Sequence, residues 1–162
     1  MPRWSRWLWI SVAVIALDQI TKAAIAASFR LGEASPVTPF FSLILAYNTG
    51  AAFSFLAGEA GWQRWLFTVI AIAACVLMLW LLKRGGSALY CIGLALIVGG
   101  ALGNLYDRLV LGHVIDFLLF HWRGWSYPAF NVADSAITCG AAALIVDSFR
   151  QRHPATAAGE ER

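Results

Sequence analysis

Residues 65–82 read WLFTVIAIAACVLMLWLL, eighteen residues without one charged side chain. At 1.5 Å per residue, a helix of that length is about 27 Å long, close to the roughly 30 Å hydrocarbon thickness of a bilayer. The stretch therefore predicts a helix that crosses a membrane.

Three further apolar stretches are long enough, or nearly so, to form such helices. They are residues 7–27, 89–111 and 131–149. The chain is 60% hydrophobic and 13% charged, whereas about a quarter of a soluble domain is charged. The sequence thus predicts a mainly α membrane protein with four transmembrane helices in one domain, residues 1–150, followed by a polar, disordered cytoplasmic tail at 151–162.

Positive side chains are sorted along the chain. They gather before the first predicted span, between the second and third, and after the fourth: Arg3, Arg6, Lys83, Arg84, Arg150, Arg152 and Arg162. The positive-inside rule then predicts cytoplasmic termini and two long outer loops. The net charge of +3 is therefore explained by topology and does not indicate nucleic-acid binding. A cleaved signal peptide at the N-terminus is an alternative, but Asp18 and Lys22 interrupt its apolar region.

The first outer loop, residues 28–61, carries strand signals. Pro36 and Pro39 disfavour helix, residues 40–47 are rich in apolar and aromatic side chains, and residues 48–50 read Asn-Thr-Gly before the apolar run 51–56. This pattern predicts a small β-sheet or hairpin platform on the outer, periplasmic membrane surface. An extended peptide could add to a free edge of such a platform.

The first and third predicted spans carry polar residues at helical spacing. Asp18 and Lys22 lie four residues apart on one helix face, as a structural ion pair or as part of a catalytic site. In the third span Gly100, Asn104 and Arg108 recur every four residues. Arg108 could reach the headgroups, but Asn104 lies a turn deeper and requires a partner inside the bundle. The small residues Gly93, Gly99, Gly100 and Gly103 predict close packing of a neighbouring helix.

Two aspartates flank the start of the fourth predicted span. Asp116 lies in the second outer loop, whose apolar residues suit the membrane interface, and Asp134 follows Asn131 by three residues. Asn131 and Asp134 alone could be ordinary helix-start residues. Two carboxylates at one membrane boundary, however, are costly to keep ionised. We expect them to share a proton and activate a water.

Metal and thiol chemistry have weaker signals. His113, Asp116 and His121 follow a spacing that matches no established helical ligand pair, so no metal or other cofactor is expected. The three cysteines all lie in apolar spans, which predicts packing and no disulfide framework: Cys75, Cys91 and Cys139.

Five motifs, in order, resemble those of the bacterial lipoprotein signal peptidases (signal peptidase II). They are DQITK at 18–22, YNTGAAFS at 47–54, GGALGNLYDRL at 99–109, VIDF at 114–117 and FNVADS at 130–135. The resemblance covers the chain except its tail and includes the four-span frame.

The resemblance implies an aspartic endopeptidase of the bacterial cytoplasmic membrane. Such enzymes cut prolipoproteins on the amino side of a cysteine that already carries a diacylglyceryl group, with the active site at the outer face. It implies Asp116 and Asp134 as the catalytic pair and Asp18 with Lys22 as a polar pair in the first span. Supporting and substrate-contacting positions would be Asn48, Gly50, Asn104, Arg108 and Asn131. Implied partners are the modified prolipoproteins and membrane lipids, with the enzyme a monomer.

Two non-enzymatic alternatives stay open on the residues alone. A small four-span transporter or channel could use the polar stripe of the first and third spans, and a scaffold could use the glycine-rich third span. Neither explains the two aspartates. A presenilin-type protease would require Gly-x-Gly-Asp within a span, which the sequence lacks.

Overall fold

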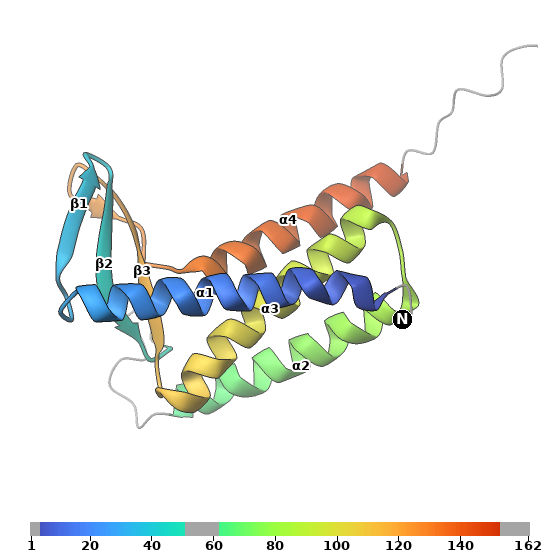
Figure 1. Ribbon diagram of the computed structural model, residues 1–162. Coiled ribbons are helices and arrows are strands. Elements are labelled where there is room, and N and C mark those ends of the chain that lie inside the picture. The colour runs from blue at the N-terminus through green and yellow to red at the C-terminus, as the bar shows by residue number, and fades with distance from the viewer. Residues whose placement is uncertain (1–3, 51–61, 153–162) are drawn as a thin grey trace, which may run out of the picture.

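Four long helices and a small sheet make up the part of the chain that is described, residues 4–50 and 62–152 of a computed structural model. The helices are α1 (Leu8–Ser28, preceded by the 3-10 turn η1, Ser5–Trp7), α2 (Trp62–Arg84), α3 (Ala88–Val110) and α4 (Val132–Arg152). The strands are β1 (Ala34–Thr38), β2 (Phe41–Asn48), β3 (Val114–Trp122) and β4 (Trp125–Ser126). The sheet lies at one end of the helices, and the N-terminus lies at the other (Figure 1).

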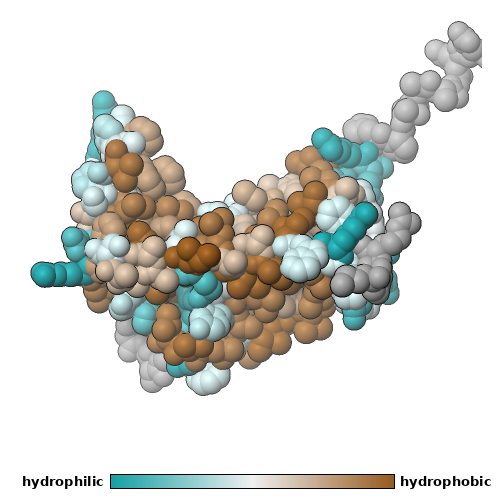
Figure 2. All heavy atoms as spheres, viewed as in Figure 1, coloured by the Kyte–Doolittle hydropathy of each residue, from teal (hydrophilic) through white to brown (hydrophobic). Residues whose placement is uncertain are grey.

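The four predicted spans are confirmed, with ends displaced by at most three residues. Each of the four helices is long and apolar enough to cross a membrane. Hydrophobic residues cover much of the helical flank (Figure 2). On α2, for instance, Val69 and Val76 are 62% and 64% exposed, which suits a helix that faces lipid. The predicted tail falls almost wholly on residues 153–162, outside the described part.

Helix α3 is the centre of the bundle and contacts the other three helices. Its glycines permit this packing, as predicted. A Cβ on Gly93 would lie 2.8 Å from the Gly140 carbonyl oxygen of α4, and one on Gly99 would lie 3.0 Å from the Ser11 Cα of α1. Such distances are below van der Waals contact, so side chains at these positions would force the helices apart.

The sheet is antiparallel, in the order β1-β2-β3-β4. Strand β2 confirms the strand expected at 40–47, but its expected partner at 51–56 lies outside the described residues. Its observed partners are β1 before it and β3 from the connection between α3 and α4, with Phe41 opposite Phe120 and Asn48 opposite Val114. The sheet thus joins the α1–α2 and α3–α4 connections.

Strand β3 was not predicted; its region was expected to be an interfacial apolar loop. Its sequence, VIDFLLFHW, is rich in β-branched and aromatic residues and therefore carries a strand signal. The signal was hidden because an apolar run beside a membrane also fits burial in lipid. Pairing with β2 satisfies the backbone of this segment and fixes the position of Asp116 opposite Ala46.

Candidate active site

Four elements meet where the sheet joins the bundle. The end of β2 contributes Asn48, α3 contributes Asn104, β3 contributes Asp116, and the start of α4 contributes Asn131 and Asp134. A continuous chain of hydrogen bonds connects all five side chains. The structure therefore brings together residues that are up to 86 positions apart in sequence.

Asp116 is held at both carboxylate oxygens. Its Oδ1 accepts a hydrogen bond from Asn131 Nδ2 at 2.7 Å, and its Oδ2 accepts one from Asn48 Nδ2 at 3.0 Å. The residue is only 3% exposed. Both donors are amides rather than cations, so the carboxyl group is oriented without being neutralised.

Asp134 is held in a similar way but is only half-buried. Its Oδ1 accepts from Asn104 Nδ2 at 2.8 Å, and its Oδ2 accepts from the Asn131 backbone N–H at 3.2 Å. The Asp134 backbone N–H in turn donates to Asn131 Oδ1 at 3.0 Å. These reciprocal bonds form a helix N-cap, so the capping and site interpretations of Asp134 are compatible.

Asn131 is the brace between the two aspartates. It is fully buried, and besides Asp116 its Nδ2 lies 3.2 Å from Asn104 Oδ1 and 3.2 Å from the Ile115 carbonyl oxygen. One side chain thus contacts β3, α3 and the first turn of α4. Its burial and its bonds fix the distance between the two carboxyl groups.

A buried ionic cluster lies directly behind this site. Lys22 Nζ lies 2.8 Å from Asp18 Oδ2 and 2.8 Å from Asp107 Oδ2, and it donates to Asn104 Oδ1 at 3.0 Å. Because an ammonium group only donates, the oxygen of the Asn104 amide faces Lys22 and its nitrogen faces Asp134. The pair of Asp18 and Lys22 expected on one helix face is an ion pair in the structure.

The two carboxylates of this cluster also bind backbone next to the site aspartates. Asp18 Oδ1 accepts the N–H of Ala133, the residue before Asp134, at 2.9 Å. Asp107 Oδ2 accepts the N–H of Ile115, the residue before Asp116, at 3.3 Å. The cluster therefore anchors both chain segments that carry the site.

Asp107 was missed as a site residue, as was Gln19, whose Nε2 donates to Asp107 Oδ1 at 2.9 Å. Asp107 follows Asn104 by three residues and therefore shares its helix face, a signal that was available in the sequence. Asp18, four residues before Lys22, already supplies the lysine with a carboxylate partner, so the spacing alone does not indicate a second acid.

Arg108 and Gly50 lie beside the site. Arg108 Nη1 donates to the Asn104 carbonyl at 3.3 Å and its guanidinium lies 5.3 Å from the centre of the Phe67 ring. Its Nε is buried and has no hydrogen-bond partner. Gly50 has φ +103°, and its N–H donates to Asn48 Oδ1 at 2.9 Å, which turns the Asn48 amide nitrogen toward Asp116.

The environment of Asp116 favours its neutral form. Burial, and next the negative charge of Asp134, raise the pKa of Asp116 from 3.8 to about 7. The hydrogen bonds from Asn48 and Asn131 and the charge of Lys22 act in the opposite direction but are weaker. Near neutral pH, Asp116 can therefore hold or release a proton.

The histidines considered as metal ligands are engaged elsewhere. The His113 ring stacks on Tyr47 with centroids 3.9 Å apart, and His121 Nε2 lies 2.8 Å from Ser42 Oγ. Across residues 4–50 and 62–152, no three His, Cys, Asp or Glu side chains are grouped so as to hold a metal ion. The candidate site itself gathers two carboxyl groups and three asparagine amides.

Comparison with known proteins indicates the same family as the motifs do. Residues 10–150 match the family described as signal peptidase (SPase) II. The chain belongs to the signal peptidase II family. It is therefore a peptidase and a multi-pass protein of the bacterial inner membrane, as the resemblance implied.

Two relatives illustrate how similar in sequence this chain is to other family members. The lipoprotein signal peptidase of Ralstonia nicotianae is 59% identical over 146 residues, which cover 90% of this chain and 84% of that protein. The enzyme of the same name from Pseudomonas aeruginosa is 57% identical over 157 residues, covering 94% and 92%.

Solved structures share the fold. One, described as a bacterial membrane enzyme at 2.3 Å resolution, has a TM-score of 0.80 with 28% identity and covers 98% of this chain and 94% of its own. A second, described in the same way at 1.9 Å, has a TM-score of 0.78 with 30% identity, covering 88% and 91%. The arrangement of four helices with a small sheet is thus that of known bacterial membrane enzymes.

Proposed function

We propose that this peptidase removes the signal peptide of prolipoproteins by cutting on the amino side of a cysteine that carries a diacylglyceryl group. Family membership and the names of the relatives support the substrate class. The single observation that carries the mechanism is the pair Asp116 and Asp134, each oriented by asparagine amides at the end of the bundle.

In the proposed mechanism the two aspartates act on one water molecule. Two neighbouring carboxyl groups hold one proton between them, because ionising both is costly. The ionised aspartate accepts a proton from the water as the water oxygen attacks the scissile carbonyl carbon. The protonated aspartate donates its proton to the carbonyl oxygen, and a proton is then passed to the departing amine as the C–N bond breaks.

The assignment of the two roles follows from the different surroundings. Asp116 is the more deeply buried of the two, and its pKa is raised to about 7, so we assign it the proton in the resting enzyme. Asp134 is more exposed and lies within the first turn of α4, where the positive end of the helix dipole favours a negative charge. Asp134 is accordingly assigned as the base, although the pair titrates as one unit.

The neighbouring polar residues have separate proposed roles. Asn48, Gly50 and Asn131 orient Asp116. Asn104 was expected to bind the substrate, but both ends of its amide are occupied by Lys22, Asn131 and Asp134, so we assign it to positioning. Arg108, whose Nε has no partner, is the proposed donor to a substrate carbonyl or ester oxygen.

The orientation of the enzyme is part of the proposal. Basic residues between α2 and α3 and at the far end of α4 support a cytoplasmic position for those ends, and hence an outer position for the aspartates. Water is available there, while the diacyl chains of the substrate stay in the lipid. One domain spanning residues 1–150 and acting as a monomer suffices for this chemistry.

The transporter alternative is less well supported. A transport path would require polar groups along the depth of the bundle. The polar cluster instead gathers where the sheet joins the helices, and its Lys22 is enclosed by three acceptors.

The test is cleavage of a synthetic prolipoprotein peptide with a diacylglyceryl cysteine by the purified protein in detergent, with a chelator present. Mass spectrometry of the products should show one cut just before the lipidated cysteine. The unlipidated peptide and the Asp116→Asn protein serve as controls, and neither should give product. Cutting elsewhere in the peptide, or loss of activity with chelator, would contradict the proposal.

A further inference from the structure

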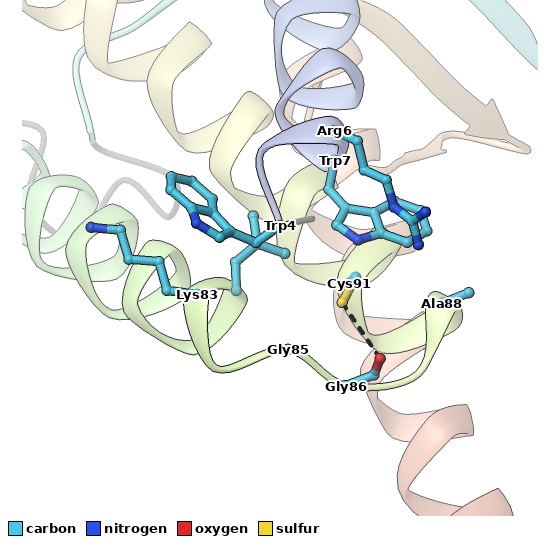
Figure 3. Close-up of a pocket in the computed structure, with 9 residues that line it drawn as sticks. Trp4, Arg6, Trp7, Lys83, Gly85, Gly86, Ala88 and Cys91 are labelled. Carbon is cyan, nitrogen blue, oxygen red and sulfur yellow. Dashed lines mark hydrogen bonds between the residues drawn. The ribbon is translucent and has the colours of Figure 1, made fainter. Parts of the chain in front are cut away.

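A second site lies at the opposite end of the bundle from the aspartates. There, the start of α1 and the connection between α2 and α3 enclose a hollow of about 380 Å³. The indoles of Trp4 and Trp7 lie above the connection that contains Gly85 and Gly86, with Lys83 and Arg6 at its sides (Figure 3). None of these residues contacts the peptidase site.

The polar part of the hollow is positively charged. Lys83 Nζ lies 5.4 Å from the centre of the Trp4 ring, and Arg6 Cζ lies 4.7 Å from that of Trp7. Within the described part of the chain, the salt bridges are those of Lys22, so neither Arg6 nor Lys83 is paired with a carboxylate there. Both cations are held by aromatic faces, which leaves their N–H groups available to an anion.

The acidic residue of α4 at this end of the bundle is already hydrogen-bonded. Asp147 of α4 is buried, and its carboxylate accepts hydrogen bonds from Ser87 Oγ and from Gln151 Nε2, the latter at 2.6 Å. No acidic residue is among those that line the hollow. Its lining is therefore positive, and neither cation has a carboxylate partner among residues 4–50 and 62–152.

The inner wall of the hollow is apolar. Leu82 and Cys91 are buried and belong to a cluster with Leu94, against which Trp4 and Trp7 pack. Indole rings favour the headgroup level of a bilayer, where their N–H meets polar groups and their rings meet hydrocarbon. A cationic rim above an apolar wall suits a ligand with an anionic head and an apolar body.

We infer that this hollow binds the phosphodiester group of an anionic phospholipid in the leaflet opposite the peptidase site. The ends of α1, α2 and α3 that form it lie where these helices leave the membrane. In the proposed orientation this is the cytoplasmic leaflet, where basic residues meet anionic headgroups. The inference does not depend on the peptidase chemistry.

The test is native mass spectrometry of the delipidated protein in neutral detergent, titrated separately with dioleoyl phosphatidylglycerol and dioleoyl phosphatidylcholine. We expect phosphatidylglycerol to bind with an affinity at least a few-fold higher than that of phosphatidylcholine. Substituting Arg6→Gln together with Lys83→Gln should weaken phosphatidylglycerol binding by about 25-fold. Each positive charge near an anionic headgroup raises the binding affinity about fivefold.

The matched control is Arg84→Gln. Arg84 adjoins Lys83 in sequence but lies over Trp80, with its Cζ 3.7 Å from the ring centre, and does not line the hollow. Its substitution should change the affinity less than twofold. Unchanged melting temperatures in neutral detergent without lipid would show that all variants are folded.

Three results would overturn the inference. The first is equal affinity of the wild-type protein for the two lipids. The second is an equal loss in Arg84→Gln and in the double variant, which would indicate general surface charge. The third is displacement of the lipid by glycerol 3-phosphate at millimolar concentration, which would identify a site for a soluble phosphate instead.

Discussion

Helices α2 and α3 have the same length, 23 residues, and opposite surroundings. Leu77 of α2 is 48% exposed, whereas Leu94 of α3 is fully buried. Helix α3 also carries Asn104 and Asp107 near its C-terminal end, while α2 has no charged residue from 65 to 82. Hydropathy identifies both helices as spans, but only the small and polar residues reveal which one packs against protein and holds the site.

The largest loss of stability is expected on substitution of Lys22, because this lysine bonds Asp107 and Asn104 of α3. Lys22→Met would leave Asp18 and Asp107 buried without a cation, at a cost of about 3–5 kcal/mol in the free energy of unfolding. The measurement is reversible unfolding in mixed detergent micelles. Lys83→Met is the control because Lys83 is exposed and outside any salt bridge of the described residues. Similar losses in both variants would contradict the role given to the ionic cluster.

The comparison of the two helices can be tested directly with one substitution at two places. Leu94→Ala should cost about 2–5 kcal/mol in the free energy of unfolding because it empties a packed site. Leu77→Ala should stay within about 0.5 kcal/mol. If the free energy of unfolding fell by the same amount in both variants under identical micelle conditions, α2 would be packed as tightly as α3.

A smaller effect is expected for the brace between the aspartates. Asn131→Ala removes the amide that donates to Asp116 at 2.7 Å and should lower the cleavage rate roughly 10–100-fold, since a buried acceptor left without its donor costs about 1–3 kcal/mol. Part of this decrease in rate would come from the loss of the N-cap of α4. Asn131→Ser keeps a capping oxygen, so it should preserve the melting temperature and still lower the rate. A normal rate in Asn131→Ser would show that Asn131 only caps the helix.

The smallest predicted change comes from pH alone. With the pKa of Asp116 raised to about 7, activity that needs its proton should fall about fivefold between pH 7 and pH 8. A rate that is flat over this range, with substrate saturating, would be evidence against Asp116 as the proton donor.

The same raised pKa has a consequence for stability. In the unfolded chain Asp116 loses its proton near 3.8, but in the folded protein it keeps the proton until about 7. The folded state therefore binds more protons between these values, and the free energy of unfolding should decrease as pH rises through that window. In Asp116→Asn this decrease should be reduced; an unchanged slope would assign it to another group.

Sequence alone predicted the spans from local signals, and the family motifs named most of the polar residues that the structure brings together. Eighteen apolar residues define a span, and Asn131 followed by Asp134 defines a helix start. The pairing of β2 with β3 was not predictable in this way, since it joins loops separated by two helices and its register depends on both partners. Asp107 was missed for a related reason: a buried lysine can bind two carboxylates, and its own helix shows only Asp18.

We propose that Asp116 and Asp134 act as one catalytic unit. This is tested by the cleavage rate of the lipidated peptide with four folded proteins: wild type, Asp116→Asn, Asp134→Asn and the double variant. Each single variant should lose at least about a thousandfold in rate, and the double variant should lose little more, because residues that act as a unit are strongly non-additive. Near wild-type cleavage by either single variant, or losses that multiply in the double variant, would contradict the claim.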